Sequence, residues 1–309
     1  MKHTLKVTLA LIAFFFLAQV VGLLIVSQYI DHKKTIEARE IVYKPLPYNL
    51  ERPQVENQSY SFIYITIAII FGTILILLLI RFNKPNIWRF WFFATVWLTL
   101  SIAFASFINT IAAAVLALVV AVLKIYRPNI LLQNISEIFI YGGLAAIFVP
   151  IINIFSAVML LIVISIYDFI AVFKTKHMVK LAEFQSSSKI FAGLLIPYER
   201  GKVSIKSQMP SKTKVKIEKS SGKAASKQSV AVLGGGDIGF TLIFAGVVMK
   251  SLMFQDTFLV GFLKTLIIPV FVTIALFILL MKGQQNKFYP AMPVLSIGCF
   301  IGYAVVWLI

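Results

Sequence analysis

Two aspartates lie inside long apolar runs of this 309-residue chain, and they are the first candidates for chemistry. Asp168 lies in NIFSAVMLLIVISIYDFIAVF, and Asp237 follows three glycines in VLGGGDIGF. An ionised carboxylate near the centre of a bilayer costs about 2.5–3.5 kcal/mol on insertion scales. Because of this cost, acids in apolar segments are rare and mark functional sites.

The two carboxyls are predicted to lie at the same depth. Asp168 precedes Lys174 by six residues, or about 9 Å at a helical rise of about 1.5 Å per residue. Asp237 follows Val230 by seven residues, or about 10 Å by the same rise. One run descends to the polar segment between them and the next climbs away from it. Both acids should therefore sit about two helical turns inside the same face.

Glycines next to Asp237 indicate close packing at that point. Small residues let membrane helices approach one another, and glycine also weakens a helix, which leaves backbone groups free to pair with an extended peptide. A plain packing seam would use the same residue type, but a second acid at equal depth favours a functional site. The glycines are Gly234, Gly235 and Gly236.

Two neighbouring carboxyls can carry out acid–base chemistry. They cannot both ionise easily, so the pair should share one proton, which also reduces the cost of burial. Such a pair can hydrolyse an amide, because one carboxylate takes a proton from water while the protonated partner donates to the carbonyl oxygen. The titration belongs to the pair, so neither Asp168 nor Asp237 is assigned as the permanent acid or base.

A third element of interest is the segment KFYPAMPVLSIG near the end of the chain. Pro290 and Pro293 bracket Ala291 and Met292, a few residues inside the same face as the aspartates. Two prolines withhold two backbone donors and resist regular helix, which predicts a rigid, partly open turn. An ordinary helix start, where proline is common, explains the pattern equally well.

Composition indicates which elements hold these residues. The chain is 60% hydrophobic and 13% charged, and a soluble protein of this size could not bury so much apolar surface. We therefore predict an all-α polytopic membrane protein with about nine transmembrane helices, across a core that needs about 20 residues. The first run is longer than the apolar part of a signal peptide and is interpreted as a retained anchor. The spans are 5–29, 61–80, 88–107, 110–124, 131–149, 153–173, 230–253, 257–281 and 289–308.

The basic residues set the predicted orientation and domains. Lysines and arginines of the connecting loops fall on one side, which the positive-inside rule makes cytoplasmic, with the N-terminus inside and the C-terminus outside. Residues 1–173 hold helices one to six, 174–229 form a basic, partly disordered cytoplasmic loop, and 230–309 hold the last three helices.

The stretch Ile190–Pro197 is too short to cross and is expected at the interface. The formal charge of +17 is concentrated in the loop, beside anionic lipid, so no nucleic-acid partner is predicted.

Three short motifs occur in order on the sixth, seventh and ninth spans: Tyr167-Asp168, Gly234-Gly-Gly-Asp237 and Pro290-Ala-Met-Pro293. In this combination the chain resembles the presenilin and signal peptide peptidase family of intramembrane aspartyl proteases, with motifs YD, GxGD and PAL. It is most similar to the compact archaeal homologues of presenilin. The resemblance covers the whole topology, but specific residues only in the last half.

The resemblance implies a role for each motif. Asp168 and Asp237 would be the catalytic dyad, and Met292 stands where the family usually has leucine, a residue of similar volume. The residues that would support the active site are Tyr167, Gly234, Gly235, Gly236, Pro290, Ala291, Met292 and Pro293.

The resemblance also implies the partners. Substrates would be transmembrane segments of single-span proteins, or signal peptides, with membrane lipid as the surrounding partner. The cytoplasmic placement of 174–229 matches presenilins and is opposite to signal peptide peptidases, so we expect substrates whose N-terminus faces outside. No cofactor is implied, and no metal site is predicted, because none of the three histidines lies in an apolar run. A homo-oligomer stays open.

Two other functions use the same features. Buried carboxylates and glycine-broken helices also mark the ion paths of proton- or cation-coupled transporters. A scaffold or leak pore could use the two acids for packing alone. Against a transporter, the two halves show no inverted repeat, and the only acid in the first five spans is Glu137, near an edge.

Overall fold

The computed structural model describes residues 5–82, 85–175, 191–198, 229–255, 257–283 and 289–309. Within these ranges seven helices are long and apolar enough to cross a membrane, and two further apolar helices, α5 and α12, are shorter. The predicted all-helical, polytopic fold is confirmed. The helices are α1 Leu5–Gln28, α2 His32–Ala38, α3 Ser61–Arg81, α4 Pro85–Ala105, α5 Thr110–Tyr126, α6 Ile130–Phe148, α7 Ile154–Ile170, α9 Gly235–Gln255, α10 Phe258–Thr265, α11 Ile267–Lys282 and α12 Met292–Leu308.

Short elements complete the described chain. Two strands, β1 Gly193–Tyr198 and β2 Ser229–Gly234, form an antiparallel hairpin. A π-helical turn, η4 Ala171–Thr175, follows α7. Three 3₁₀ turns lie in the connections: η1 Pro47–Asn49, η2 Gln58–Tyr60 and η3 Val149–Ile151.

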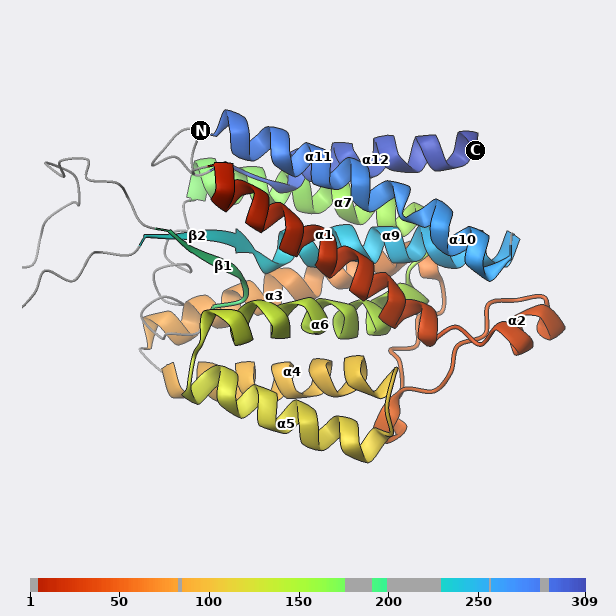
Figure 1. Ribbon diagram of the computed structural model, residues 1–309, viewed down its shortest axis with the longest axis horizontal. Coiled ribbons are helices and arrows are strands. Elements are labelled where there is room, and N and C mark those ends of the chain that lie inside the picture. The colour runs from red at the N-terminus through yellow and green to blue at the C-terminus, as the bar shows by residue number, and fades with distance from the viewer. Residues whose placement is uncertain (1–4, 83–84, 176–190, 199–228, 256, 284–288) are drawn as a thin grey trace, which may run out of the picture.

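The helices pack in layers around α9 (Figure 1). Helix α1 crosses the middle of the bundle and contacts α6, α9 and α11, while α4 and α5 form one outer edge and α11 and α12 the other. The hairpin lies at the end of the bundle that holds the N-terminus, and α2 projects from the opposite end, where the C-terminus lies (Figure 1).

Helix α9 is the centre of the apolar core. It is apolar on all sides, which is typical of a helix that is surrounded by others, and Leu242, Ala245 and Val247 are fully buried. Gln19 of α1 donates hydrogen bonds to the Ile238 carbonyl at 3.0 Å and to the Thr241 hydroxyl at 2.9 Å. The first helix is therefore tied to the start of α9.

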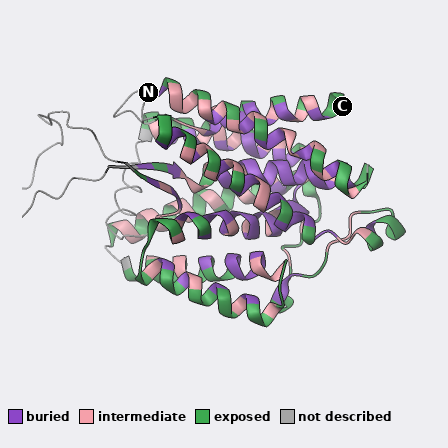
Figure 2. Ribbon diagram, viewed as in Figure 1, coloured by how far each residue is buried: buried purple, intermediate pink, exposed green. Residues whose placement is uncertain are grey.

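The outer helices expose their apolar side chains (Figure 2). On α3, Ile67 and Phe71 are more than half exposed, as expected where hydrocarbon is the solvent. Small residues make the helix contacts: Ala117 and Ala121 of α5 are fully buried beside α4. Such residues let backbones approach closely in lipid.

The hairpin corrects two predictions. Residues 229–234 form a strand and α9 begins at Gly235, whereas a helix was predicted from residue 230. The stretch 190–197, expected only to lie at the interface, contains most of the strand that pairs with it. The cause is non-local, because 30 residues of chain, 199–228, separate the partner strands.

Two other predicted spans have different bounds. The span 257–281 consists of two helices that meet at Leu266, two residues before the helical Ile268-Pro269 pair. The span 289–308 becomes helical at Met292. Most of the predicted loop 174–229 lies outside the described residues.

Candidate active site

The hairpin delivers Asp237 to the start of α9. Gly193 pairs with Gly234, and the Gly235 N–H donates to the Ala192 carbonyl at 3.2 Å. Gly193 has φ of +144°, and a Cβ there would overlap the Leu233 carbonyl, so only glycine fits at the position where the chain enters β1. Asp237 follows in the first turn of α9, at the positive end of the helix dipole.

Asp168 lies in the last turn of α7 and is held by α12. Its side chain is 6% exposed, and its Oδ2 accepts a hydrogen bond from the Met292 N–H at 3.1 Å. Met292 is the first residue of α12. The carboxyl therefore occupies an anion-binding position at a helix N-terminus, where unsatisfied N–H groups point outward.

The motif with two prolines is a helix start. Pro293 lies in the first turn of α12, and the Ala291 carbonyl accepts hydrogen bonds from the N–H groups of Val294 and Leu295, each at 3.1 Å. Proline fits the first turn of a helix because its missing N–H would have no partner there. The same helix start presents the donor to Asp168, so it positions a candidate site residue.

The two aspartates lie on neighbouring helices. Helix α7, which carries Asp168, packs against α9, which carries Asp237, and against α12. Neither acid takes part in an ion pair with a cation in the described part of the chain. The carboxyl of Asp168 lies at the N-terminus of α12, and Asp237 lies in the first turn of α9.

The glycines make room around Asp237. A Cβ at Gly234 would lie 3.3 Å from Oδ2 of Asp237, so the carboxyl lies directly over this glycine. A Cβ at Gly235 would overlap the Tyr141 hydroxyl of α6, whereas at Gly236 the nearest side chain, Phe240, would be 3.6 Å away. Gly234 and Gly235 are therefore required by contacts, and Gly236 is not.

Tyr167 does not lie with the other motif residues. Its hydroxyl is hydrogen-bonded to the Thr73 hydroxyl of α3 at 3.1 Å. This bond ties α7 to α3 and points the side chain toward a different helix from those that carry the two carboxyls. Pro290 and Ala291 directly precede α12, whose first N–H group, that of Met292, donates to Asp168. They therefore contribute to the site through the backbone.

The side-chain amides of two adjacent α6 residues, Gln133 and Asn134, hold β1 in place. This role was not predicted from the sequence. Gln133 donates to the Phe191 carbonyl at 2.8 Å and to the Gly193 carbonyl at 3.1 Å. Asn134 donates to the Leu195 carbonyl and accepts from the Leu195 N–H, both at 2.8 Å. A Gln-Asn pair at the start of an apolar span was the available signal, because amides in lipid need partners.

Glu137, the acid near the edge of the fifth predicted span, is buried and ion-paired. It is 1% exposed and forms an ion pair of 2.6 Å with Lys124 of α5. Lys124 also donates to the Ser136 hydroxyl at 2.9 Å, and Gln133 donates to Glu137 at 2.9 Å. This acid is compensated by a cation and by two neighbouring polar groups.

The hairpin has one open edge. Because both backbone groups of Leu195 face Asn134, Leu195 and its partner Val232 form a non-hydrogen-bonded pair. In such an antiparallel pair the N–H and C=O of both residues point away from the partner strand. The N–H and C=O of Val232 therefore face the outer edge of β2, and the side chain is 50% exposed. Strand β2 is followed at once by α9, whose first turn carries Asp237.

Comparison with known proteins identifies the family of the chain. The model of the family described as "Signal-peptide peptidase, presenilin aspartyl protease" matches residues 12–309. No curated protein matches the chain. In the described residues, no three His, Cys, Asp or Glu side chains gather as a metal site would require.

Two solved structures have a similar fold, each described as a presenilin family intramembrane aspartate protease. One, in a P2 space group, has a TM-score of 0.58 and 18% identity, and covers 97% of each chain. The other, in a C222 space group, has a TM-score of 0.55 and 20% identity, and covers 96% of this chain and 99% of that one. Together with the family match over nearly the whole sequence, they show that the chain belongs to the signal-peptide peptidase and presenilin family and is a multi-pass intramembrane aspartyl protease.

Proposed function

We propose that Asp168 and Asp237 form a dyad that shares one proton and hydrolyses peptide bonds inside transmembrane segments. The observation that carries this proposal is the packing of α7 against α9, which brings two acids onto neighbouring helices with no cation paired to either in the described residues. Like charges at close range favour one shared proton. That state supplies a base and an acid together.

The proposed reaction needs only the dyad and one water molecule. The ionised carboxyl removes a proton from water, the oxygen attacks the peptide carbonyl, and the protonated carboxyl donates to the carbonyl oxygen, which gives a tetrahedral diol. Transfer of a proton to the amide nitrogen then breaks the C–N bond and releases an amine and a carboxylic acid. The two aspartates exchange roles during the cycle, so neither is assigned permanently.

The open edge of β2 supports a way to present the substrate. A transmembrane helix hides its peptide bonds in its own hydrogen bonds, so it must unwind before water can attack. An extended segment can add to an exposed strand edge through main-chain hydrogen bonds, and the outward groups of Val232 offer that edge five residues before Asp237. Hydrogen bonds to β2 would replace those lost on unwinding.

The placement of the termini supports the proposed orientation. The N-terminus and the hairpin lie at one end of the bundle and the C-terminus at the other (Figure 1). Strand β1 belongs to the predicted basic segment 174–229 and β2 begins at its end, so the hairpin end is cytoplasmic under the positive-inside rule. Residues 1–173 and 230–309 then form the membrane parts on either side of that segment. The expected substrates are single-span proteins whose N-terminus faces outside, and signal peptides of that orientation.

A cleavage assay with the full chain tests the proposal. Detergent-purified protein is incubated with a fluorogenic transmembrane peptide, with and without a transition-state mimic of aspartyl proteolysis. We expect cleavage that the mimic stops and that Asp168→Asn and Asp237→Asn each abolish. If folded Asn variants still cut the peptide, the dyad is wrong. Coupled ion uptake into vesicles that needs the same two acids, without any cleavage, would favour a transporter.

In oriented vesicles, a substrate with its N-terminus outside should be cut and its reversed counterpart should not. If only the reversed peptide is cut, the orientation is wrong but the dyad stands.

A further inference from the structure

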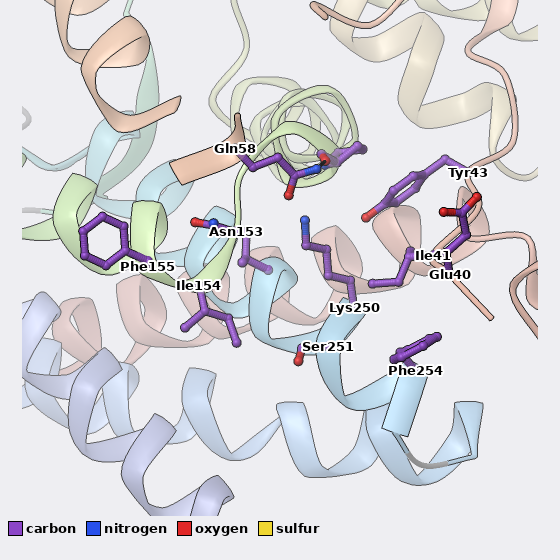
Figure 3. A pocket seen from close by; sticks show the side chains of 12 residues that line it. Glu40, Ile41, Tyr43, Gln58, Asn153, Ile154, Phe155, Lys250, Ser251 and Phe254 are labelled. Atoms are coloured by element: carbon purple, nitrogen blue, oxygen red, sulfur yellow. Dashed lines mark hydrogen bonds between the residues drawn. The ribbon is translucent and has the colours of Figure 1, made fainter. Parts of the chain in front are cut away.

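A pocket of about 560 Å³ lies at the end of the bundle opposite the aspartates. It is enclosed by the connection after α2, the start of α7 and the end of α9 (Figure 3). Lys250 and Asp237 are both on α9, 13 residues apart, or about 20 Å at the helical rise. The pocket is therefore separate from the candidate active site and lies near the other membrane surface.

A buried ammonium group lies in this pocket. Lys250 is 7% exposed and donates hydrogen bonds to the carbonyls of Val149 and Ile152. Val149 begins η3 and Ile152 follows it; the Val149 carbonyl also accepts from the Ile152 N–H at 3.5 Å. An ammonium group has three donors and no acceptor, so the two carbonyls leave one N–H available. The bonds stabilise the lysine without neutralising its charge.

Tyr43 supplies a second donor. Its hydroxyl is buried and has no hydrogen-bond partner among the described residues, and Figure 3 shows it directed toward the side of the pocket that holds Lys250. A buried hydroxyl without a partner is costly. The guanidinium of Arg52 lies 5.4 Å from the centroid of the Tyr43 ring, which adds a second positive charge close to this side chain. This arrangement suits an anion with several acceptor oxygens.

The rim of the pocket is aromatic. Phe155 of α7 and Phe254 of α9 line it and are largely exposed on the outside of the bundle. Aromatic side chains are typical of the level where lipid headgroups meet hydrocarbon. A cationic interior with an apolar rim fits a molecule that has an anionic head and an acyl chain. Glu40, an exposed carboxylate that also lines the pocket, would weaken such binding.

We infer that this pocket binds the phosphate group of an anionic lipid in the leaflet remote from the aspartates, with Lys250 and Tyr43 as its donors. The phosphate oxygens accept from the free N–H of Lys250 and from the Tyr43 hydroxyl, and an acyl chain follows Phe155 and Phe254 into the bilayer. The inference does not depend on the proposed dyad, because it concerns binding alone.

Native mass spectrometry of the full chain in detergent tests the inference. Phosphatidylglycerol is the probe, diacylglycerol with the same chains lacks the phosphate, and inorganic phosphate lacks the chains. We expect phosphatidylglycerol to bind much more tightly than either control. Equal binding of diacylglycerol would show that chains alone are held, and equal binding of inorganic phosphate would show a small-anion site; each result overturns the lipid assignment.

Variants locate the binding site. Lys250→Met should weaken phosphatidylglycerol binding about tenfold or more, because a charge-assisted hydrogen bond is lost. The matched control Lys282→Met removes an exposed lysine at the other end of the bundle and should leave binding unchanged. Equal binding by the two variants would overturn the inference.

Two further variants keep the test decisive if Lys250→Met does not fold. Tyr43→Phe removes only the unpartnered hydroxyl and should weaken binding about threefold with no loss of stability. Glu40→Gln should strengthen binding, because a carboxylate near an anion is removed. Unchanged affinity in Tyr43→Phe, or weaker binding in Glu40→Gln, would contradict an anionic ligand at this place.

Discussion

Two groups of ionisable side chains inside this bundle are compensated in opposite ways. Glu137 has an ion pair with Lys124 and a hydrogen bond from Gln133. Asp168 and Asp237 have no cation partner in the described residues, and Asp168 accepts a hydrogen bond from the Met292 N–H. A buried acid with an opposite charge is structural, because its cost is already balanced. Two acids without a cation lack this compensation, so the cost of placing them in the bundle is more consistent with a function than with packing.

The largest expected effect separates the two groups by activity. Asp168→Asn or Asp237→Asn should lower the cleavage rate by about 10²–10⁴-fold or to the detection limit, because acid–base catalysis is lost. The midpoint of thermal unfolding should not fall, since asparagine has the same volume and no charge. Glu137→Gln is the matched control, and it should retain cleavage per folded molecule. A control that loses as much activity as the aspartate variants would erase the distinction.

The next effect separates the groups by stability. Lys124→Met should destabilise the protein by about 3–5 kcal/mol, because it leaves Glu137 buried without its cation. The double variant Lys124→Met with Glu137→Leu should recover most of that loss, since apolar residues can replace a buried pair. Unfolding in denaturant, followed by circular dichroism, measures both. A double variant no more stable than the single one would show that the pair stabilises the fold beyond cancelling its own charges.

A backbone variant tests how the site receives substrate. Val232→Pro removes an outward N–H without breaking a hairpin hydrogen bond, so kcat/KM should fall about tenfold, which is roughly 1.4 kcal/mol. Thermal stability should stay the same. Leu233→Pro is the control, because its N–H faces β1 and its loss should also lower stability. Unchanged turnover in Val232→Pro would mean that substrate does not add to this edge.

The smallest expected effect comes from a neutral bond beside the site. The hydroxyls of Ser165 and Ser296 are hydrogen-bonded at 2.9 Å between α7 and α12. Ser296→Ala should cost about 0.6 kcal/mol, which is typical of such bonds in membranes. Ser165→Ala should cost the same, and the double variant should add little. A loss as large as that of Lys124→Met would show that charge does not set the scale of these effects.

The sequence predicted what depends on local pattern. Nine apolar runs, and the shared depth of Asp168 and Asp237, follow from counting residues along helices, since each residue adds a fixed rise. Helices α7 and α9, which carry the two acids, pack against each other. Gly298 and Gly302 of α12 lie against the α11 backbone, as small residues at helix contacts in lipid do.

What the sequence did not predict depends on partners far along the chain. The strand at 229–234 exists because residues 193–198 pair with it, and six residues before a helix carry too little local preference to show this. The burial of Glu137 required knowing that α5 brings Lys124 beside it. The Met292 donor required knowing that α12 begins beside α7. Each of these is set by how helices pack.

The hydrogen bond between Met292 and Asp168 has a mechanical consequence. An ionised carboxyl accepts an N–H more strongly than a protonated one. The hydrogen bond to the first turn of α12 should therefore strengthen when Asp168 is ionised and weaken when the shared proton moves to Asp168. Each turnover would then change the force on Pro290–Pro293 and on helix α12, which begins there. A spectroscopic probe attached to α12 would report each proton transfer between the aspartates as a movement of the helix.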